Sequence, residues 1–208
     1  MHRKAYTYQA YTRDNIHSLP QYQRLSADIQ HAVQVVSAVF PFRTNCYVAD
    51  ELIDWDRVPN DPIYQLTFPQ RGMLADSDFH TISRLIRQGA SRTDLRAAAD
   101  RIRLAHNPHP AGQLEHNVPA LDGERLAGIQ HKYHETVLFF PSRGQTCHAY
   151  CSYCFRWPQF VGMEDLKFAA REVDGLIAYL RQHTEVTDVL FTGGDPAIMT
   201  TRALRQYI

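Results

Sequence analysis

Three cysteines on one short segment constrain this chain more than any other feature. Cys147, Cys151 and Cys154 form a C-x3-C-x2-C array shortly after the apolar run 137–140. Three thiolates on one loop can ligate three irons of a [4Fe-4S] cluster, whose usual complement is four cysteines. The fourth iron is then open to a ligand that is not protein, so the array predicts a site for chemistry rather than for electron storage alone.

Zinc and disulfides are the alternative uses of these cysteines. Structural zinc takes four closed ligands, usually from two separated pairs, and the remaining cysteine, Cys46, is far upstream, while His148 sits inside the loop. A disulfide within the array would strand the other thiols, and the start of the chain, Met1-His2-Arg3-Lys4, lacks the apolar run of a signal peptide. We expect a cluster, with zinc, a disulfide or inert thiols as alternatives.

A second motif follows the run Asp188-Val189-Leu190-Phe191, which is typical of an apolar strand. It reads Thr192-Gly193-Gly194-Asp195-Pro196. Paired glycines let backbone approach a ligand closely, because no Cβ stands in the way, and the carboxylate of Asp195 can accept from an ammonium group. Taken alone, the motif is equally compatible with an ordinary turn.

Between the two motifs the sequence predicts a helix over residues 164–180. Glu164 and Asp165 would place negative charge at its N-terminus. The order of strand, cysteine loop, helix and strand predicts a right-handed β-α-β unit, the start of a (β/α) barrel with its active site at the C-terminal ends of the strands. The apolar positions that recur at helical spacing are Leu166, Ala169, Ala170, Val173, Leu176, Ile177 and Leu180.

The cysteine spacing resembles the signature of the radical S-adenosylmethionine (radical SAM) superfamily. Residues 151–156, Cys-Ser-Tyr-Cys-Phe-Arg, together with 131–133 and 137–140, are similar to the lysine 2,3-aminomutase family within it. Residues 60–69, with Asp61-Pro62 and Gln65, resemble a segment of that family's N-terminal region, and the turn at 107–110 occupies its expected place. The resemblance runs from Phe40 onward.

The resemblance implies a partial TIM barrel of the radical SAM type and assigns roles within it. Tyr153 would pack beside the adenine of S-adenosylmethionine, unless it is an ordinary loop aromatic. Arg156 would grip the substrate carboxylate, for which its fork suits it, unless it forms a structural ion pair. The residues assigned to the cluster or to S-adenosylmethionine are Cys147, Cys151, Cys154, Tyr153, Gly193, Gly194 and Asp195.

The implied reaction is a 1,2-amino migration on a small amino-acid substrate. A reducing electron donor and the cluster would cleave S-adenosylmethionine to a 5′-deoxyadenosyl radical, and pyridoxal phosphate would carry the migrating nitrogen. Members of the family have several arginines after the last cysteine, whereas this chain reads Phe155-Arg156-Trp157-Pro158. The substrate is therefore open, as are a different reaction outcome and a non-catalytic or inactive iron–sulfur or zinc protein.

Length is a further departure from the family. Only two β-α units can be counted before Ile208, so we expect the front portion of a longer enzyme, with the barrel incomplete and the chain insufficient for turnover. Lys4, Lys132 and Lys167 are its only lysines, and none matches the position of the pyridoxal phosphate lysine. We expect that lysine outside this chain.

Composition narrows the partners. Lys plus Arg and Asp plus Glu are both 22, which gives no expectation of nucleic acid, and 44% hydrophobic residues without an apolar span exclude a membrane protein. We expect a cytoplasmic protein, with a homo-oligomer as one option. Loop histidines exposed to solvent, rather than a metal site, are expected at His106, His109, His116, His131 and His134.

Three regions are expected along the chain. Residues 1–112 form a mainly helical N-terminal region, 113–136 a connector, and 137–208 the first β-α units of the barrel. In the first region we expect a helix over 30–40, one capped by Ser77 and ended by Gly89, and one capped by Thr93 with Ala105 facing inward. The boundary is expected at the breaker cluster 107–112.

Overall fold

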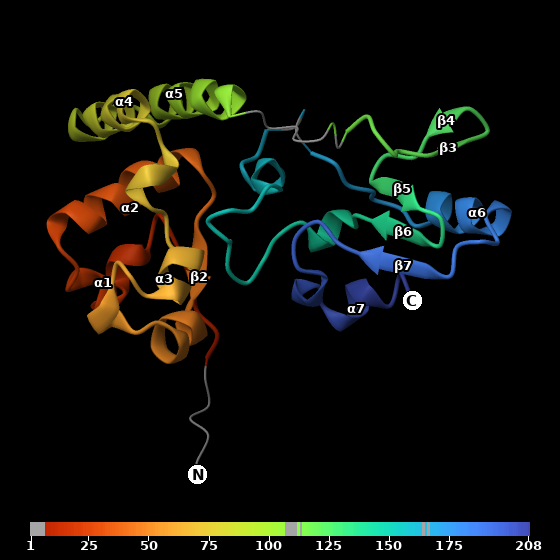
Figure 1. The fold of residues 1–208 in the computed structure, drawn as a ribbon, viewed down its shortest axis with the longest axis horizontal. Coiled ribbons are helices and arrows are strands. Elements are labelled where there is room, and N and C mark those ends of the chain that lie inside the picture. The colour runs from red at the N-terminus through yellow and green to blue at the C-terminus, as the bar shows by residue number, and fades with distance from the viewer. Residues whose placement is uncertain (1–6, 107–111, 113, 164, 166) are drawn as a thin grey trace, which may run out of the picture. The chain divides into compact units, whose positions relative to one another are not determined.

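The computed structural model describes residues 7–106, 112, 114–163, 165 and 167–208. It is a mixed α/β structure of helices and small sheets, and the described strands form no closed barrel (Figure 1). The chain divides into two compact units, which are described separately below. One comprises Met1–Asn107 with His148–Cys154, and the other Pro108–Cys147 with Phe155–Ile208. None of the described helices is long and apolar enough to cross a membrane.

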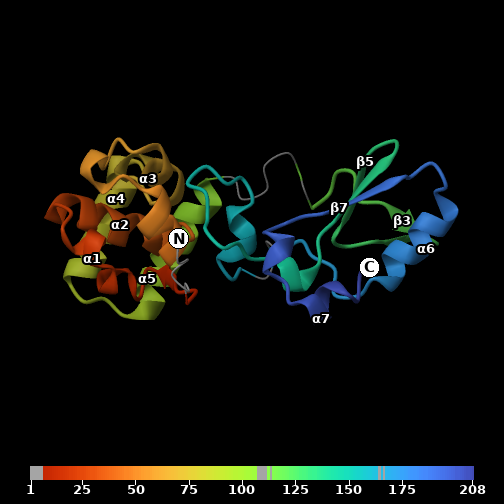
Figure 2. The ribbon, with the colours of Figure 1, turned by 90° about the horizontal axis from the view of Figure 1, so that it is seen from below.

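The first unit is mainly helical, with one small antiparallel pair of strands (Figure 2). Its aromatic core includes Tyr64 and Phe68, whose rings stack at 4.6 Å, and Phe42, which lies 5.2 Å from Phe68. The elements are β1 (Ala10–Thr12), η1 (Ile16–Ser18), α1 (Pro20–Gln23), α2 (Ala27–Val39), β2 (Arg43–Asn45), η2 (Val48–Leu52), η3 (Trp55–Arg57), α3 (Pro62–Thr67), η4 (Arg71–Met73), α4 (Asp76–Arg87) and α5 (Arg92–Ala105).

The predicted helices of this unit are present, but α2 begins at Ala27, ahead of the predicted residue 30, and the caps predicted for the other two were wrong. Helix α4 begins at Asp76, ahead of Ser77, with acidic side chains in its first turn that favour the dipole in place of a side-chain cap. Helix α5 is capped by Ser91, whose hydroxyl accepts from the Asp94 backbone N–H at 3.1 Å, so Thr93 lies inside the helix. Gly89 follows the end of α4 at φ 63°, as predicted, whereas Ala105 is exposed.

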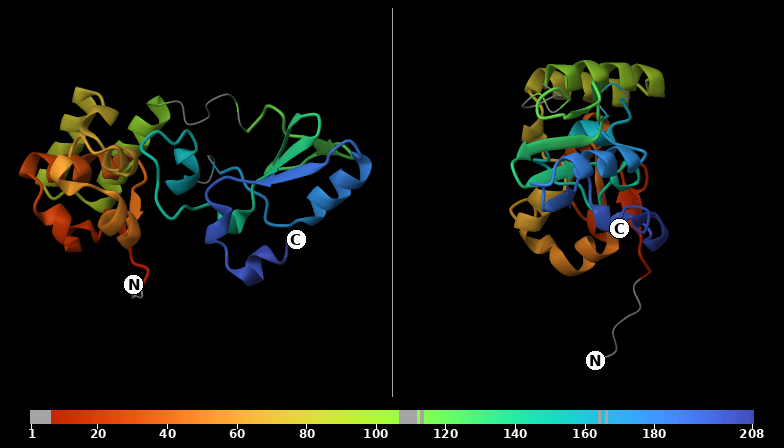
Figure 3. Two further views of the ribbon diagram at one scale, coloured as in Figure 1. Left: turned by 60° about the horizontal axis from the view of Figure 1, so that its bottom comes forward. Right: turned by 90° about the vertical axis from the view of Figure 1, so that its right-hand side faces the viewer.

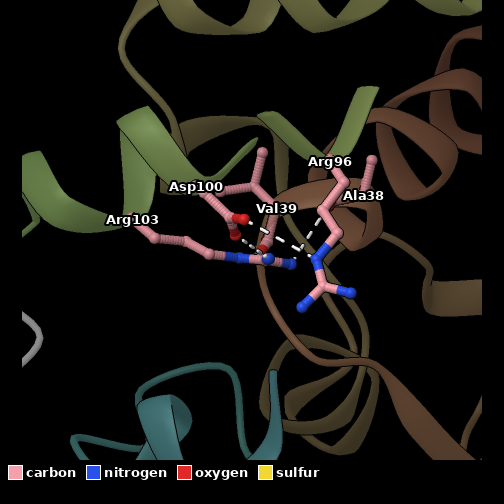
Figure 4. A network of polar contacts seen from close by, with 5 residues as sticks. All are labelled: Ala38, Val39, Arg96, Asp100 and Arg103. Atoms are coloured by element: carbon pink, nitrogen blue, oxygen red, sulfur yellow. Dashed lines mark hydrogen bonds and ion pairs between the residues drawn. The ribbon is translucent and has the colours of Figure 1, made fainter. Parts of the chain in front are cut away.

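A buried arginine ties α5 to the end of α2 (Figure 4). Arg103 is 8% exposed and donates from Nε to the Val39 carbonyl at 2.5 Å and from Nη2 to the Ala38 carbonyl at 3.3 Å. Its Nη1 lies 2.6 Å from Asp100, which also pairs with Arg96 at 3.7 Å. The guanidinium therefore satisfies carbonyl groups that the end of α2 leaves without helical partners.

The core of this unit contains one hydroxyl that predicts a stabilising substitution. Tyr64 is 1% exposed, and its hydroxyl has no hydrogen-bond partner in the described part of the chain. Burial, and secondly the charge of Tyr22, raises the pKa of Tyr64. Tyr64→Phe removes an unsatisfied buried group, so the free energy of unfolding should rise by about 1 kcal/mol at neutral pH. Urea denaturation measures this change.

The same variant should alter the alkaline limit of stability. The pKa of Tyr64 is higher in the folded state than its unfolded value of about 10. The stability that the neutral phenol contributes is therefore complete below the unfolded pKa and is lost as the pH rises through the folded-state pKa. Tyr64→Phe should lose less stability above pH ~10 than the parent chain. The matched control is Tyr22→Phe, which removes a hydroxyl that donates to the Gln30 carbonyl at 3.0 Å and should destabilise. Equal destabilisation by both variants would contradict the prediction.

The second unit is built around a three-stranded sheet in the order β5-β6-β7. Strand β5 pairs antiparallel with β6, and β7 pairs parallel with β6 in the register Thr136↔Asp188 to Phe139↔Phe191. The expected connector thus contributes strands, β5 among them. The elements are β3 (Ala120–Leu121), β4 (Glu124–Arg125), β5 (Ile129–Tyr133), β6 (Thr136–Phe139), η6 (Ser142–Gly144), η7 (Trp157–Phe160), α6 (Asp174–Gln182), β7 (Asp188–Phe191), η9 (Pro196–Ile198) and α7 (Thr201–Leu204).

Helix α6 lies along this sheet and completes the predicted β-α-β order (Figure 3). Its buried residues Leu176 and Tyr179 belong to one apolar cluster with Ile129, Val137 and Phe139. Burial of these side chains removes apolar surface from water on the face of the sheet that α6 covers. The two strands predicted from the apolar runs are confirmed.

The predicted helix over 164–180 is wrong in its first half. Helix α6 begins only at Asp174; Glu164 and Leu166 lie outside the described residues. Ala170 instead extends the sheet region, because its N–H donates to the Phe140 carbonyl at 2.8 Å and its carbonyl accepts from the Ser142 N–H at 2.8 Å. Its backbone packs so tightly on Gly128, at φ 79°, that a Cβ there would lie 2.2 Å from the Ala170 nitrogen.

His131 also differs from its prediction as a loop residue exposed to solvent. It lies in β5, half-buried, with Nδ1 2.6 Å from the Tyr179 hydroxyl, and its ring meets that of His183 edge-on at 5.7 Å. The rings of Tyr179 and His183 stack at 4.0 Å. These contacts attach the start of the sheet to α6. His109 and the turn 107–110 lie outside the described residues.

Candidate functional site

Both predicted motifs follow the C-terminal ends of neighbouring parallel strands. The segment 141–147 leaves β6, and Thr192-Gly193-Gly194-Asp195 leaves β7. The Thr192 N–H donates to the Phe139 carbonyl at 2.9 Å, so the pairing continues one step past β7. Parallel strands end at the same edge of a sheet, and the segment that leads into Cys147 therefore meets the β7 loop within the second unit, where a β/α protein places its ligand.

Both glycines are required by close approach between these two segments. A Cβ on Gly194 would lie 2.2 Å from the Thr146 carbonyl oxygen and 2.7 Å from that of Gly144. Gly193 adopts φ 116°, and a Cβ there would lie 2.2 Å from Nε2 of Gln145. The glycine pair predicted for approach to a cofactor thus has an internal reason as well, namely contact with the backbone that leads into Cys147.

Gln145 connects the two strand ends. Its Nε2 donates to the Pro141 carbonyl at 2.9 Å and to the Thr192 carbonyl at 3.3 Å. Its Oε1 is buried and has no hydrogen-bond partner among the described residues. Sequence reasoning missed this residue, because a glutamine between Gly144 and Thr146 matches no motif.

Asp195 is fixed at the start of the short helix η9. Its backbone N–H donates to the Thr146 carbonyl at 2.7 Å, one residue before Cys147. Its Oδ1 accepts from the Ala197 backbone N–H at 2.9 Å, which caps η9. The carboxylate is therefore held in one orientation beside the cysteine segment, although the structure assigns it no ligand.

None of the four cysteines forms a disulfide, and they differ in burial. Cys46 is buried in the first unit, where its Sγ contacts the Thr7 carbonyl at 3.6 Å. Cys151 is exposed, whereas Cys147 and Cys154 are partly buried. Cys147 belongs to the second unit and the other two to the first. Among the described residues, no three Cys, His, Asp or Glu side chains are grouped as ligands for a metal ion.

Within the first unit, the segment 148–154 is held by β2 and α3. Asn45 donates from Nδ2 to the His148 carbonyl at 3.1 Å, and the Tyr150 N–H donates to the Arg43 carbonyl at 2.9 Å. Ser152 donates from its N–H to the Leu66 carbonyl at 2.8 Å and from Oγ to the Gln65 carbonyl at 2.7 Å. The helical region therefore fixes the backbone between Cys147 and Cys154. Sequence reasoning missed Asn45 and Ser152.

Tyr153 and Arg156 flank the last cysteine. The Tyr153 side chain is 79% exposed. The guanidinium of Arg156 lies over the Phe140 ring at 4.4 Å and the Phe155 ring at 5.1 Å, within the range of cation–π contact. Their roles toward adenine and a substrate carboxylate stay predictions.

Comparison with known proteins gives consistent relatives. The chain is 28% identical over 186 residues to the "Putative L-lysine 2,3-aminomutase" of Aquifex aeolicus, covering 89% of this chain and 39% of that protein. It is 23% identical over 193 residues to the L-lysine 2,3-aminomutase of Methanococcus maripaludis, covering 93% and 35%. A match to the L-lysine 2,3-aminomutase of Bacillus subtilis is 35% identical over 83 residues, covering 40% and 17%. No family model and no solved structure matches.

These comparisons confirm the resemblance that the motifs predicted. The chain is similar to proteins named L-lysine 2,3-aminomutase along most of its length, at low identity. It spans 39% of the Aquifex protein and 35% of the Methanococcus protein, well under half of either.

Proposed function

We propose that this chain belongs to a radical SAM enzyme of the lysine 2,3-aminomutase type, acting on a small amino acid. The observation that carries the proposal is the contact between the β7 loop and the residue before the first cysteine: the Asp195 N–H donates to the Thr146 carbonyl at 2.7 Å. The similarity to proteins named as aminomutases over 89% of the chain supports the same assignment.

The thiols of the cysteine array have the chemistry that an iron–sulfur cluster requires of its ligands. Cys147, Cys151 and Cys154 form no disulfide and are at least partly accessible, and soft thiolates are the ligands that iron–sulfur clusters take. Cys46 is buried among apolar side chains and is proposed as structural. The three cysteines of the array would hold the cluster, which with bound S-adenosylmethionine supplies a one-electron cleavage and a radical for hydrogen abstraction.

The chain's own part in this chemistry is positioning. Gly193 and Gly194 let the β7 loop lie against residues 144–146, and the cap on η9 orients the Asp195 carboxylate to accept from an ammonium group. Asn45 and Ser152 would restrict the backbone between the cysteines, so the loop loses less freedom when its thiolates are ligated. Arg156 would bind a carboxylate after leaving the ring of Phe140.

Pyridoxal phosphate enters the proposal only as a cofactor of the family. Lys132 and Lys167 are both exposed, and Lys132 lies over the ring of Tyr133 at 5.5 Å. The described residues do not fit a Schiff-base site.

Asp195→Ala tests the proposed role of the β7 loop. If the carboxylate accepts from the ammonium of S-adenosylmethionine, affinity for that molecule should fall by about 1.5–3 kcal/mol, the range for a charge-assisted hydrogen bond. Equilibrium binding to anaerobically reconstituted protein measures the change, with iron content as a control that should not move. Asp188→Asn, at an exposed position at the start of β7, is the matched substitution. Unaltered affinity for S-adenosylmethionine in Asp195→Ala would indicate that Gly193-Gly194-Asp195 is an ordinary turn.

The reaction class is tested by its products. Reconstituted protein given dithionite and S-adenosylmethionine should release 5′-deoxyadenosine and methionine. The proposed reaction class predicts that incubation with the right amino acid gives the isomer with its amino group moved by one carbon. An iron-loaded protein that binds no S-adenosylmethionine would favour a non-catalytic iron–sulfur protein.

A further inference from the structure

The first unit contains a cavity that the proposed function does not use. It has a volume of about 550 Å³, within the range of small-molecule sites, and lies among α2, α3, α4 and the loops at Pro59 and Pro69. It lies wholly within residues 28–87, apart from the cysteine array and the β7 loop. Its apolar lining comprises Ile29, Ala32, Pro59, Pro69 and Phe79.

Three charged side chains line the cavity, and one of them is already neutralised. Arg71 pairs with Asp76, donates from Nη1 to the Leu74 carbonyl at 3.1 Å, and lies over the Phe79 ring at 3.9 Å. Asp28 lies in the first turn of α2 and Arg87 in the last turn of α4. Their side chains form no hydrogen bond or ion pair with any described residue. One carboxylate and one guanidinium are therefore available to a ligand.

The charges of Asp28 and Arg87 both influence the ring of His31, which also lines the cavity. Its Nε2 lies 2.8 Å from the Ser83 hydroxyl, and its ring packs edge-on against Phe79 at 5.9 Å. Burial first, and then Arg87, lowers the pKa of His31, while Asp28 opposes the shift. The imidazole is therefore neutral at pH 7, which leaves Asp28 and Arg87 as the two unpaired formal charges of the lining.

We propose that this cavity binds a zwitterionic α-amino acid with an apolar side chain. The carboxylate would meet the fork of Arg87, which suits bidentate pairing, and the ammonium would meet Asp28. The side chain would cover Pro59, Pro69 and Phe79. A simple anion would be repelled by Asp28 and a simple cation by Arg87, so the zwitterion matches the pair. This site is independent of the proposed function.

Calorimetric titration of the 208-residue protein with L-phenylalanine tests the chemistry of the ligand. L-phenylalanine should bind, whereas phenylacetate, which lacks the ammonium, and 2-phenylethylamine, which lacks the carboxylate, should each bind about tenfold or more weakly. Glycine should also bind more weakly, because it has no apolar side chain. Equal affinity for phenylacetate and L-phenylalanine, or absence of binding by both L-phenylalanine and L-leucine, overturns the proposal.

Substitutions locate the site. Asp28→Asn and Arg87→Gln should each reduce affinity for L-phenylalanine about tenfold or more, since each removes one charged partner. Both side chains are exposed, so the fold should persist, as circular dichroism will verify. The matched control is Arg84→Gln, an exposed arginine in the same last turn of α4 that does not line the cavity; its affinity should equal that of the parent chain. Wild-type affinity in both Asp28→Asn and Arg87→Gln overturns the assignment.

Discussion

Gly194→Ala is expected to destabilise the second unit strongly. The added Cβ would lie 2.2 Å from the Thr146 carbonyl oxygen, 2.6 Å from the Thr146 nitrogen and 2.7 Å from the Gly144 carbonyl oxygen. All three contacts are with backbone, which cannot move aside as a flexible side chain does. Overpacking of this kind costs about 1–3 kcal/mol, and we expect the upper end, with displacement of the segment that leads into Cys147. Chemical denaturation measures the loss.

Substitution of Gly72 is the control for Gly194→Ala, because it separates the effect of steric contact from the effect of reduced backbone freedom. A Cβ on Gly72 would meet nothing within 4 Å, and Gly72 does not have a positive φ. Gly72→Ala should leave stability unchanged or raise it slightly, because alanine narrows the unfolded ensemble. If the two substitutions cost the same, the close approach at Gly194 does not constrain the loop.

Each cysteine of the array should be indispensable for the cluster. Substitution of Cys147, Cys151 or Cys154 by alanine removes one of three protein ligands, and we expect reconstituted protein to lose its cluster in each case. Cys46→Ala should retain it, since this thiol is buried in the apolar core of the first unit and contacts the Thr7 carbonyl. Absorbance and iron content after anaerobic reconstitution measure the effect.

Either of two results would contradict this prediction about the cluster ligands. Retention of iron in Cys147→Ala, or its loss in Cys46→Ala, would exclude the three-cysteine array as the ligand set. Cys46→Ala also opens a small space in the core, so its thermal stability should be measured beside its iron content. A folded Cys46→Ala protein without iron would assign that residue as a ligand.

Local patterns in the sequence predicted the elements whose partners are close along the chain. The apolar runs 137–140 and 188–191 gave the two strands, and helical spacing gave α2 and the body of α4. Residues 169–173 were predicted wrongly as helix, because their alanines suit helix but Ala170 pairs with Phe140 and Ser142. That pairing depends on Gly128, a tertiary contact that overrides local propensity.

The residues of the candidate site likewise divide into those that local patterns predicted and those that depend on long-range contacts. Spacing alone indicated the cysteines and Gly193-Gly194-Asp195, because each motif is contiguous. Asn45 and Ser152 could not be predicted, since their partners are 103 and 87 residues away along the chain. Gln145 was missed because its contacts to Pro141 and Thr192 require that two strand ends already lie together.

The metal that this chain binds tests the central claim most directly. Anaerobic reconstitution with iron and sulfide, followed by metal and sulfide analysis, should give about four irons and four sulfides per chain, because three thiolates with bridging sulfide satisfy a [4Fe-4S] cluster. Reduction should then produce a paramagnetic spectrum that changes when S-adenosylmethionine is added, since one iron has no protein ligand. One equivalent of zinc without iron-based absorbance would contradict the account.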